Sequence, residues 1–104
     1  MHAELASKRE ALAELCRRYG VTRLEVFGSA ARTDDFDPAN SDVDFLVSFS
    51  TARRNDLTAF FDFKEAVESL LGRPVDLVER GAVENSHNYI RRRAILRDVE
   101  TVYG

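Results

Sequence analysis

The chain has 104 residues, of which 44% are hydrophobic, and a formal net charge of −3, so we expect one small domain over residues 1–104 with a modest core. The negative balance argues against general nucleic-acid binding, and the single Cys16 excludes an internal disulfide. No apolar run reaches the length of a membrane span, and the charged N-terminus does not resemble a signal peptide. We therefore expect a cytoplasmic protein without a membrane partner.

The N-terminal segment from about Ala3 to Tyr19 predicts one amphipathic helix. Its apolar side chains recur at helical spacing, while most of the charged ones face away. Gly20 is a suitable residue for the helix end. Cys16 lies on the apolar stripe and is expected to be a core residue, because nothing nearby would activate its thiol.

The first strand is predicted from Arg23 to Phe27, with Leu24 and Glu25 on opposite faces. A Gly-Ser turn follows it. Gly28 allows a backbone geometry or a close approach that a side chain would block, and Ser29 adds a hydroxyl. The next residues, up to Arg32, predict the first turn of a short helix, whose backbone N–H groups could bind phosphate oxygens.

An isolated Gly-Ser pair is usually an ordinary turn that binds nothing. The carboxylates downstream favour phosphate binding here. The intervening loop, 33–41, carries further acidic residues, which we interpret as solvated rather than as ligands. The second strand is predicted from Asp42 to Phe49, and Asp42 and Asp44 project from the same face of it.

Two carboxylates on one partly buried face repel each other and lose hydration. A divalent cation would neutralise Asp42 and Asp44. Mg²⁺ suits such a site, because it is bound by one or two carboxylates together with substrate phosphates. Mn²⁺ accepts the same oxygen ligands, so the sequence leaves the choice between the two ions open.

A second long helix is predicted from a cap at Asn55 or Asp56 to a stop at Gly72. Its three phenylalanines are expected to pack in the core, with one of them available to a partner. The third strand is predicted over residues 74–79. Asp76 points away from the apolar face of that strand, and it would join Asp42 and Asp44 if the second and third strands are neighbours. The alternative is a surface aspartate on an edge strand.

The C-terminal part is predicted to be a loop over residues 81–88 and a helix from Asn85 or Ser86 to about Val99. Arg91, Arg92, Arg93 and Arg97 give this helix a local positive charge. They fit either a solvated helix face or attraction to a triphosphate or an acidic partner, and the sequence does not decide between these. His87 is expected to be a loop or capping residue.

This order of elements predicts an α/β (α+β) sandwich, with flanking helices on a small mixed sheet of three or four strands. The motifs Gly28-Ser29-Ala30-Ala31-Arg32 and Ser41-Asp42-Val43-Asp44 resemble those of the nucleotidyltransferase superfamily that includes DNA polymerase beta. The residue sequence of these motifs is most similar to that of the minimal nucleotidyltransferase (MNT) proteins of prokaryotes, and the resemblance covers nearly the whole chain.

The resemblance implies a polymerase beta palm-like fold and a metal site of three carboxylates, which carries over to Asp42, Asp44 and Asp76. These residues would be both catalytic and metal-binding, most simply with two Mg²⁺ ions. ATP would be the substrate, and its phosphates would contact Gly28 and Ser29. Arg32 could assist there or pair with the acidic loop.

The resembled proteins are commonly paired with a small helical RNase toxin of the higher eukaryote and prokaryote nucleotide-binding (HEPN) type. Antitoxins of this group transfer AMP from ATP to a tyrosine hydroxyl of the toxin. The resemblance therefore implies a protein adenylyltransferase that acts as antitoxin in a hetero-oligomer with its toxin. Two alternatives remain: an antitoxin that neutralises by binding alone, and a nucleotidyltransferase for a small hydroxyl compound.

Overall fold

The computed structural model describes residues 3–28, 43–53, 56–85, 87–97 and 99–104. Four strands form one mixed sheet in the order β3-β2-β1-β4. Their bounds are β1 Val21–Phe27, β2 Val43–Phe49, β3 Val75–Glu79 and β4 Glu100–Tyr103. β1 is antiparallel to β2 and β4, whereas β2 and β3 are parallel. The mixed sheet with flanking helices confirms the predicted fold class.

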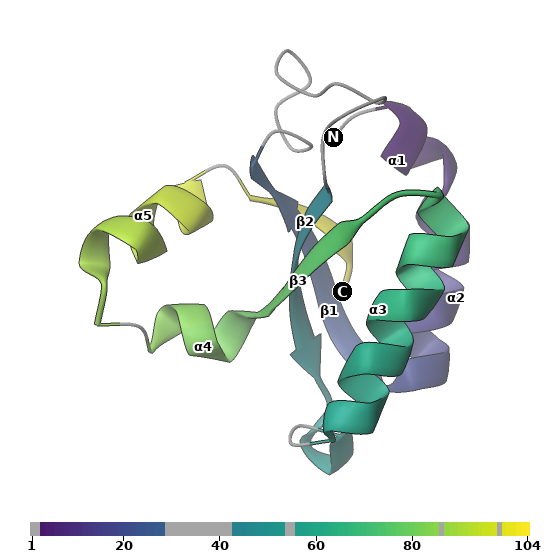
Figure 1. Ribbon diagram of the computed structural model, residues 1–104, viewed down its shortest axis with the longest axis horizontal. Coiled ribbons are helices and arrows are strands. Elements are labelled where there is room, and N and C mark those ends of the chain that lie inside the picture. The colour runs from purple at the N-terminus through teal and green to yellow at the C-terminus, as the bar shows by residue number, and fades with distance from the viewer. Residues whose placement is uncertain (1–2, 29–42, 54–55, 86, 98) are drawn as a thin grey trace.

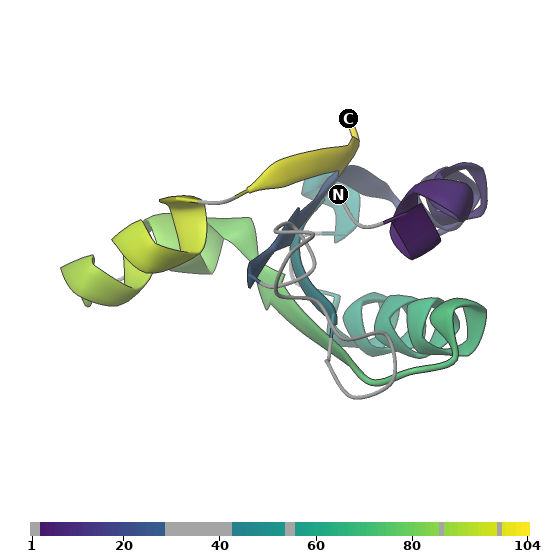
Figure 2. The ribbon, with the colours of Figure 1, turned by 90° about the horizontal axis from the view of Figure 1, so that it is seen from above.

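Helices cover the two faces of the sheet unequally. Two long helices, α2 (Arg9–Tyr19) and α3 (Leu57–Leu71), lie side by side on one face, and the short α1 (Ala3–Ser7) precedes them. Among the described helices, α4 (Arg80–Glu84) and α5 (Tyr89–Arg97) alone approach the other face, and they project sideways from the sheet (Figures 1 and 2). A 3-10 turn, η2 (Thr51–Arg53), follows β2. None of the described helices is long and apolar enough to cross a membrane.

The main core lies between the sheet and the α2–α3 layer. Alternating strand residues point into it, among them Leu24 and Val26 of β1 and Phe45 and Val47 of β2. Phe63 of α3 is fully buried against them. Of the three neighbouring phenylalanines in α3, Phe61 alone is largely exposed, at 60%, which confirms that one of them is available to a partner.

Several local predictions are confirmed. Gly20 and Gly72 end α2 and α3 in the left-handed conformation, with φ of 74° and 68°. Asp56 caps α3 by accepting a hydrogen bond from the Ala59 N–H at 3.0 Å. Cys16 is fully buried, and this burial raises the pKa of its thiol to about 12. The thiol is therefore a core group rather than a nucleophile.

The predicted N-terminal helix over Ala3–Tyr19 is wrong in one respect, because it is interrupted at Lys8. This residue leaves helical geometry, with φ of −105° and ψ of 10°. Its ammonium group donates a hydrogen bond to the Leu70 carbonyl at 2.8 Å. That contact ties the break between α1 and α2 to the last turn of α3, which a reading of local periodicity could not include.

The C-terminal prediction needs three corrections. The expected loop over residues 81–88 contains α4, because its first residue, Arg80, bonds with Glu84 one turn later. The last helix runs over Tyr89–Arg97, so it starts after Asn85 and ends before Val99; Ser86 lies outside the described residues. The chain then returns to the sheet as β4, whose Val102 is buried in the main core, and this strand was not predicted.

Candidate active site

The candidate site lies on the sheet face that α2 and α3 do not cover. Asp44 of β2 and Asp76 of β3 are directly paired in the parallel register. Neighbouring strands are about 4.8 Å apart, and paired residues project from the same side of the sheet. The predicted neighbourhood of the second and third strands is therefore observed, and it brings these two carboxylates together.

Burial differs between the two carboxylates. Asp44, on the inner strand, is partly buried, whereas Asp76, on the edge strand, is exposed. Both side chains alternate with buried apolar neighbours, Val43 and Phe45 beside Asp44 and Val75 and Leu77 beside Asp76. This alternation turns the carboxylates away from the main core, toward the sheet face that α2 and α3 do not cover. We call this side the open face and the side under α2 and α3 the closed face.

Gly28 comes close to one of these carboxylates. The register pairs Phe27 with Asp44, so the chain leaves β1 directly beside the Asp44 side chain. Gly28 has φ of +71°, and a Cβ placed on it would lie 2.7 Å from Asp44 Oδ2. Only glycine fits this geometry without a shift. The close approach predicted for Gly28 is thus present, and its neighbour is a site carboxylate.

The remaining predicted site residues, Ser29, Arg32 and Asp42, lie outside the described residues. Within the part of the chain that is described, no group of three or more His, Cys, Asp or Glu side chains is arranged to hold a metal ion. Two hard oxygen donors on adjacent strands, open to solvent on one side, nevertheless match a Mg²⁺ ion that keeps water and phosphate ligands. The donor set of Asp44 and Asp76 fits such an ion.

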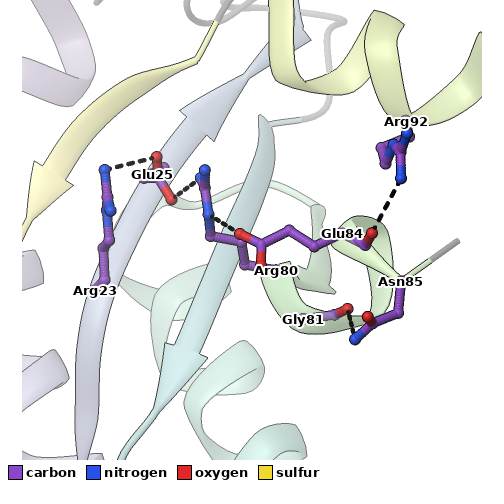
Figure 3. A network of polar contacts seen from close by, with 7 residues as sticks. All are labelled: Arg23, Glu25, Arg80, Gly81, Glu84, Asn85 and Arg92. Carbon is purple, nitrogen blue, oxygen red and sulfur yellow. Dashed lines mark hydrogen bonds and ion pairs between the residues drawn. The ribbon is translucent and has the colours of Figure 1, made fainter.

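An ion-pair network around a buried glutamate on the same face was not predicted. Glu25 of β1 is 2% exposed, and Arg80 donates to it through Nη1 (Figure 3). Arg80 Nε also donates to Glu84 Oε1 at 2.7 Å, and Arg23 approaches Glu25 Oε2 at 3.4 Å. The available signal was a glutamate inside the apolar run Leu24–Phe27, but its partner lies 55 positions away.

Three arginines of α5, Arg92, Arg93 and Arg97, line an open hollow of about 800 Å³ together with Tyr89 and Leu96. The Arg92 guanidinium stacks 5.3 Å from the Tyr89 ring centre and donates to the Glu84 carbonyl at 3.3 Å. Arg93 and Arg97 are exposed, as is His87, while the side chain of Arg91 lies outside the described set. These contacts give Arg92 a structural role.

Comparison with known proteins places the whole arrangement in a family. The model of the nucleotidyltransferase domain family matches residues 8–97. The protein adenylyltransferase MntA of Thermococcus cleftensis is 36% identical over 86 residues, which cover 83% of this chain and 79% of the relative. A Methanocaldococcus jannaschii protein that is provisionally named a protein adenylyltransferase is 37% identical over 73 residues, covering 70% of each chain.

Solved structures agree with these matches. One provisionally assigned as a minimal nucleotidyltransferase is 37% identical and aligns with a TM-score of 0.73 over 96% of this chain and 95% of its own. A toxin–antitoxin complex with AMP-PNP contains a chain of the same fold, with a TM-score of 0.66 and 18% identity over 92% and 73% of the two chains. From its sequence, its fold and its paired carboxylates, the chain belongs to the nucleotidyltransferase domain family.

Proposed function

We propose that this protein is an antitoxin that transfers AMP from ATP to a tyrosine hydroxyl of a cognate helical HEPN toxin and thereby neutralises it. The observation that carries the nucleotidyl-transfer part is the placement of Asp44 beside Asp76, with the Gly28 backbone against the Asp44 carboxylate. This arrangement supports the proposal, because it brings two potential metal ligands close to the first residue of the predicted phosphate-binding turn.

Asp42, Asp44 and Asp76 would hold divalent ions, with Mg²⁺ the expected ion. When bound, the metal would neutralise charge on the triphosphate and lower the pKa of the attacking hydroxyl. Gly28 and Ser29 would orient the β- and γ-phosphates through the turn, with Arg32 available nearby. Asp76, which is exposed, would orient the incoming hydroxyl and accept its proton.

In the proposed reaction the tyrosine oxygen attacks the α-phosphorus of ATP. The bond from that phosphorus to the oxygen bridging to the β-phosphate breaks, and pyrophosphate leaves. The hydroxyl proton passes to the Asp76 carboxylate and then to solvent. Such transfers depend mostly on positioning and electrostatic stabilisation, which a rigid sheet with fixed carboxylates can supply.

Two kinds of comparison support a protein acceptor. A relative at 36% identity is named a protein adenylyltransferase. The fold is also that of the MNT antitoxin in a complex with a tri-AMPylated HEPN toxin of Shewanella oneidensis, at a TM-score of 0.63 and 17% identity. On the molecule itself, the large apolar side chains of Leu57 and Phe61 on α3 and of Tyr89 and Ile90 on α5 are exposed, which suits a protein partner.

The test is label transfer from α-phosphate-labelled ATP, with Mg²⁺, to the co-expressed partner. Asp42→Asn and Asp44→Asn remove the proposed ligands at constant volume. Asp62→Asn is the matched control, because Asp62 is an exposed carboxylate on α3, in the layer that covers the opposite face of the sheet. Transfer by the wild type and by Asp62→Asn, lost in both site variants, is the expected result.

Two outcomes would count against the proposal. If no label reaches the partner, while wild type and site variants bind the partner equally tightly, the protein neutralises by occlusion. If label reaches a small hydroxyl compound and not the partner, the chemistry stands and the acceptor is wrong.

A further inference from the structure

Glu25 is the one charged residue that is buried among those the structure describes. It lies on β1, paired with Leu46 of β2, and faces the same side of the sheet as Asp44 and Asp76. A carboxylate in such a place requires compensation, because burial without partners disfavours its charged form strongly. The compensation comes from two arginines, Arg23 and Arg80.

The contacts around Glu25 are directional. Arg80 Nη1 donates to one carboxylate oxygen, and Arg23 Nη2 lies 3.4 Å from the other (Figure 3). Arg80 is in turn oriented by Glu84, whose Oε1 accepts from Nε at 2.7 Å. Burial opposes the charge on Arg80, but the hydrogen bonds to Glu25 and Glu84 outweigh it and raise the pKa of Arg80, so the guanidinium stays charged.

The ion pair between Glu25 and Arg80 spans three neighbouring strands of the sheet, β1, β2 and β3. Arg80 follows directly on β3, the strand that carries Asp76, whereas Glu25 lies on β1, the strand that leads into Gly28. β2, with Asp44, lies between them in the sheet. The Glu25–Arg80 pair therefore connects the strand that carries Asp76 with the strand that leads into Gly28. It does so across β2, which carries Asp44.

A small apolar cluster backs the same link. Val83 of α4 is buried against Phe27 of β1 and Leu46 of β2. Arg80 is the first residue of α4, so its contact with Glu25 holds this helix over the sheet. Phe27 immediately precedes Gly28. A shift of α4 would therefore displace Phe27 and, with it, the turn that begins at Gly28.

Stability alone is a poor reason for such a pair. Replacing a buried ion pair by apolar residues of similar volume is often neutral or even stabilising. What apolar side chains cannot reproduce is the fixed direction of a guanidinium bonded to two carboxylates. A pair retained in this place is better suited to hold a geometry than to raise the free energy of unfolding.

We propose that Glu25 and Arg80 are positioning residues, which fix β3 and the end of β1 relative to β2 and so set Asp76 and Gly28 in register with Asp44. The proposal rests on the function proposed above and assigns no contact with substrate to either residue. A misplacement of about 1 Å in a reacting constellation can lower the rate about 100-fold, so a modest loosening of the strands would suffice.

The test uses two variants and a control. Glu25→Gln keeps the shape of the side chain and removes its charge. The double variant Glu25→Met/Arg80→Met replaces the buried pair by apolar side chains, with Arg23 and Glu84 left at the solvent-facing edge. Asp62→Asn is the control, because it removes the charge of an exposed carboxylate on α3, in the opposite layer.

Two readouts separate position from stability. Amide hydrogen exchange of Val26–Gly28 and Val75–Val78 reports local opening of the two linked strands, with no need of activity. Label transfer is measured as kcat and KM for ATP, per folded molecule, well below the unfolding midpoint. The double variant is expected to keep the wild-type midpoint, to exchange at least about 10-fold faster in both segments, and to lose about 10- to 100-fold in kcat. Glu25→Gln should show the same pattern more weakly, and Asp62→Asn none of it.

A double variant with wild-type exchange and wild-type kcat would overturn the proposal, as would a loss of kcat that merely follows the folded fraction. If the wild type transfers no label, the proposed function fails, and the exchange measurement alone then decides whether the pair positions the strands.

Discussion

The two faces of the sheet are built on different principles. The face under α2 and α3 is closed by apolar side chains such as Phe45 and Phe63, which are fully buried. The other face carries Glu25, Asp44 and Asp76, and of the helices that the structure describes, only the short α4 and α5 approach it. A small domain can afford polar groups on one face only if the other supplies most of its burial. We therefore expect the closed face, under α2 and α3, to supply most of the stability and the open face to carry the chemistry.

The largest expected effect is on the closed face. Phe63→Ala removes a fully buried ring that packs edge-on against Tyr19, with ring centres 5.9 Å apart. Its removal should lower the free energy of unfolding by about 3–5 kcal/mol. Denaturant unfolding measures this, and Phe61→Ala, at a ring that is 60% exposed, should change it by less than about 0.5 kcal/mol. Transfer per folded molecule should be unchanged in Phe63→Ala, and a selective loss of turnover in that variant would contradict the division between the two faces.

Gly28→Ala tests the open face. The added methyl group would meet Asp44 Oδ2 at 2.7 Å, and φ of +71° is strained for alanine. We expect label transfer to fall about 100-fold and the free energy of unfolding to fall by about 1–3 kcal/mol.

Gly72→Ala is the matched control for that prediction. Gly72 has φ of +68°, yet nothing lies within 4 Å of its added Cβ. The Gly72→Ala variant should lose about as much stability as Gly28→Ala and keep its transfer activity. Equal activity losses in the two variants would show that strain, and not the contact with Asp44, matters.

Cys16 gives the closed face a pH signature. Because burial raises the pKa of its thiol to about 12, the folded state holds the proton more tightly than the unfolded state, whose thiol titrates near 9. This contribution is fully present below pH 9 and is lost as the pH rises toward 12. Between pH 8 and pH 10 the free energy of unfolding should therefore fall by about 1.4 kcal/mol more in the wild type than in Cys16→Ala. Equal falls in denaturant titrations would contradict the burial of the thiol.

The smallest effect is expected at the cap of α3. Asp56→Ala removes the acceptor of the Ala59 N–H and should cost about 1 kcal/mol in denaturant unfolding. Asp62→Ala, within the same helix and exposed, should cost close to nothing. Neither variant should change transfer per folded molecule. If Asp56→Ala alone changed the turnover, the N-terminal end of α3 would be coupled to the open face, contrary to this prediction.

Local patterns predicted the parts of the fold that depend on near neighbours. The glycine stops, the Asp56 cap and the alternation in β2 and β3 follow from short-range rules, and the last of these put Asp76 beside Asp44 once the strands were paired. The same rules suggested a close approach at Gly28, but not that the Asp44 carboxylate is what it approaches.

The features that were missed depend on distant residues. β4 has only four residues and forms by pairing with β1, some 75 positions earlier, so its own pattern carries little signal. The burial of Glu25 depends on Arg80, and Arg80 is placed by α4, in a segment that was predicted to be a loop. A sequence read locally cannot show which distant charge will meet a buried one.

The most direct test of the division between the faces is metal binding at the open one. Binding of Mn²⁺ in the presence of a non-hydrolysable ATP analogue can be measured by electron paramagnetic resonance for Asp76→Asn and Asp62→Asn. Both variants remove one exposed carboxylate, and only Asp76 faces the proposed site. We expect Asp76→Asn to weaken Mn²⁺ binding at least about 10-fold and Asp62→Asn to leave it unchanged. Equal affinities in the two variants would contradict the assignment of the metal–nucleotide site to this face.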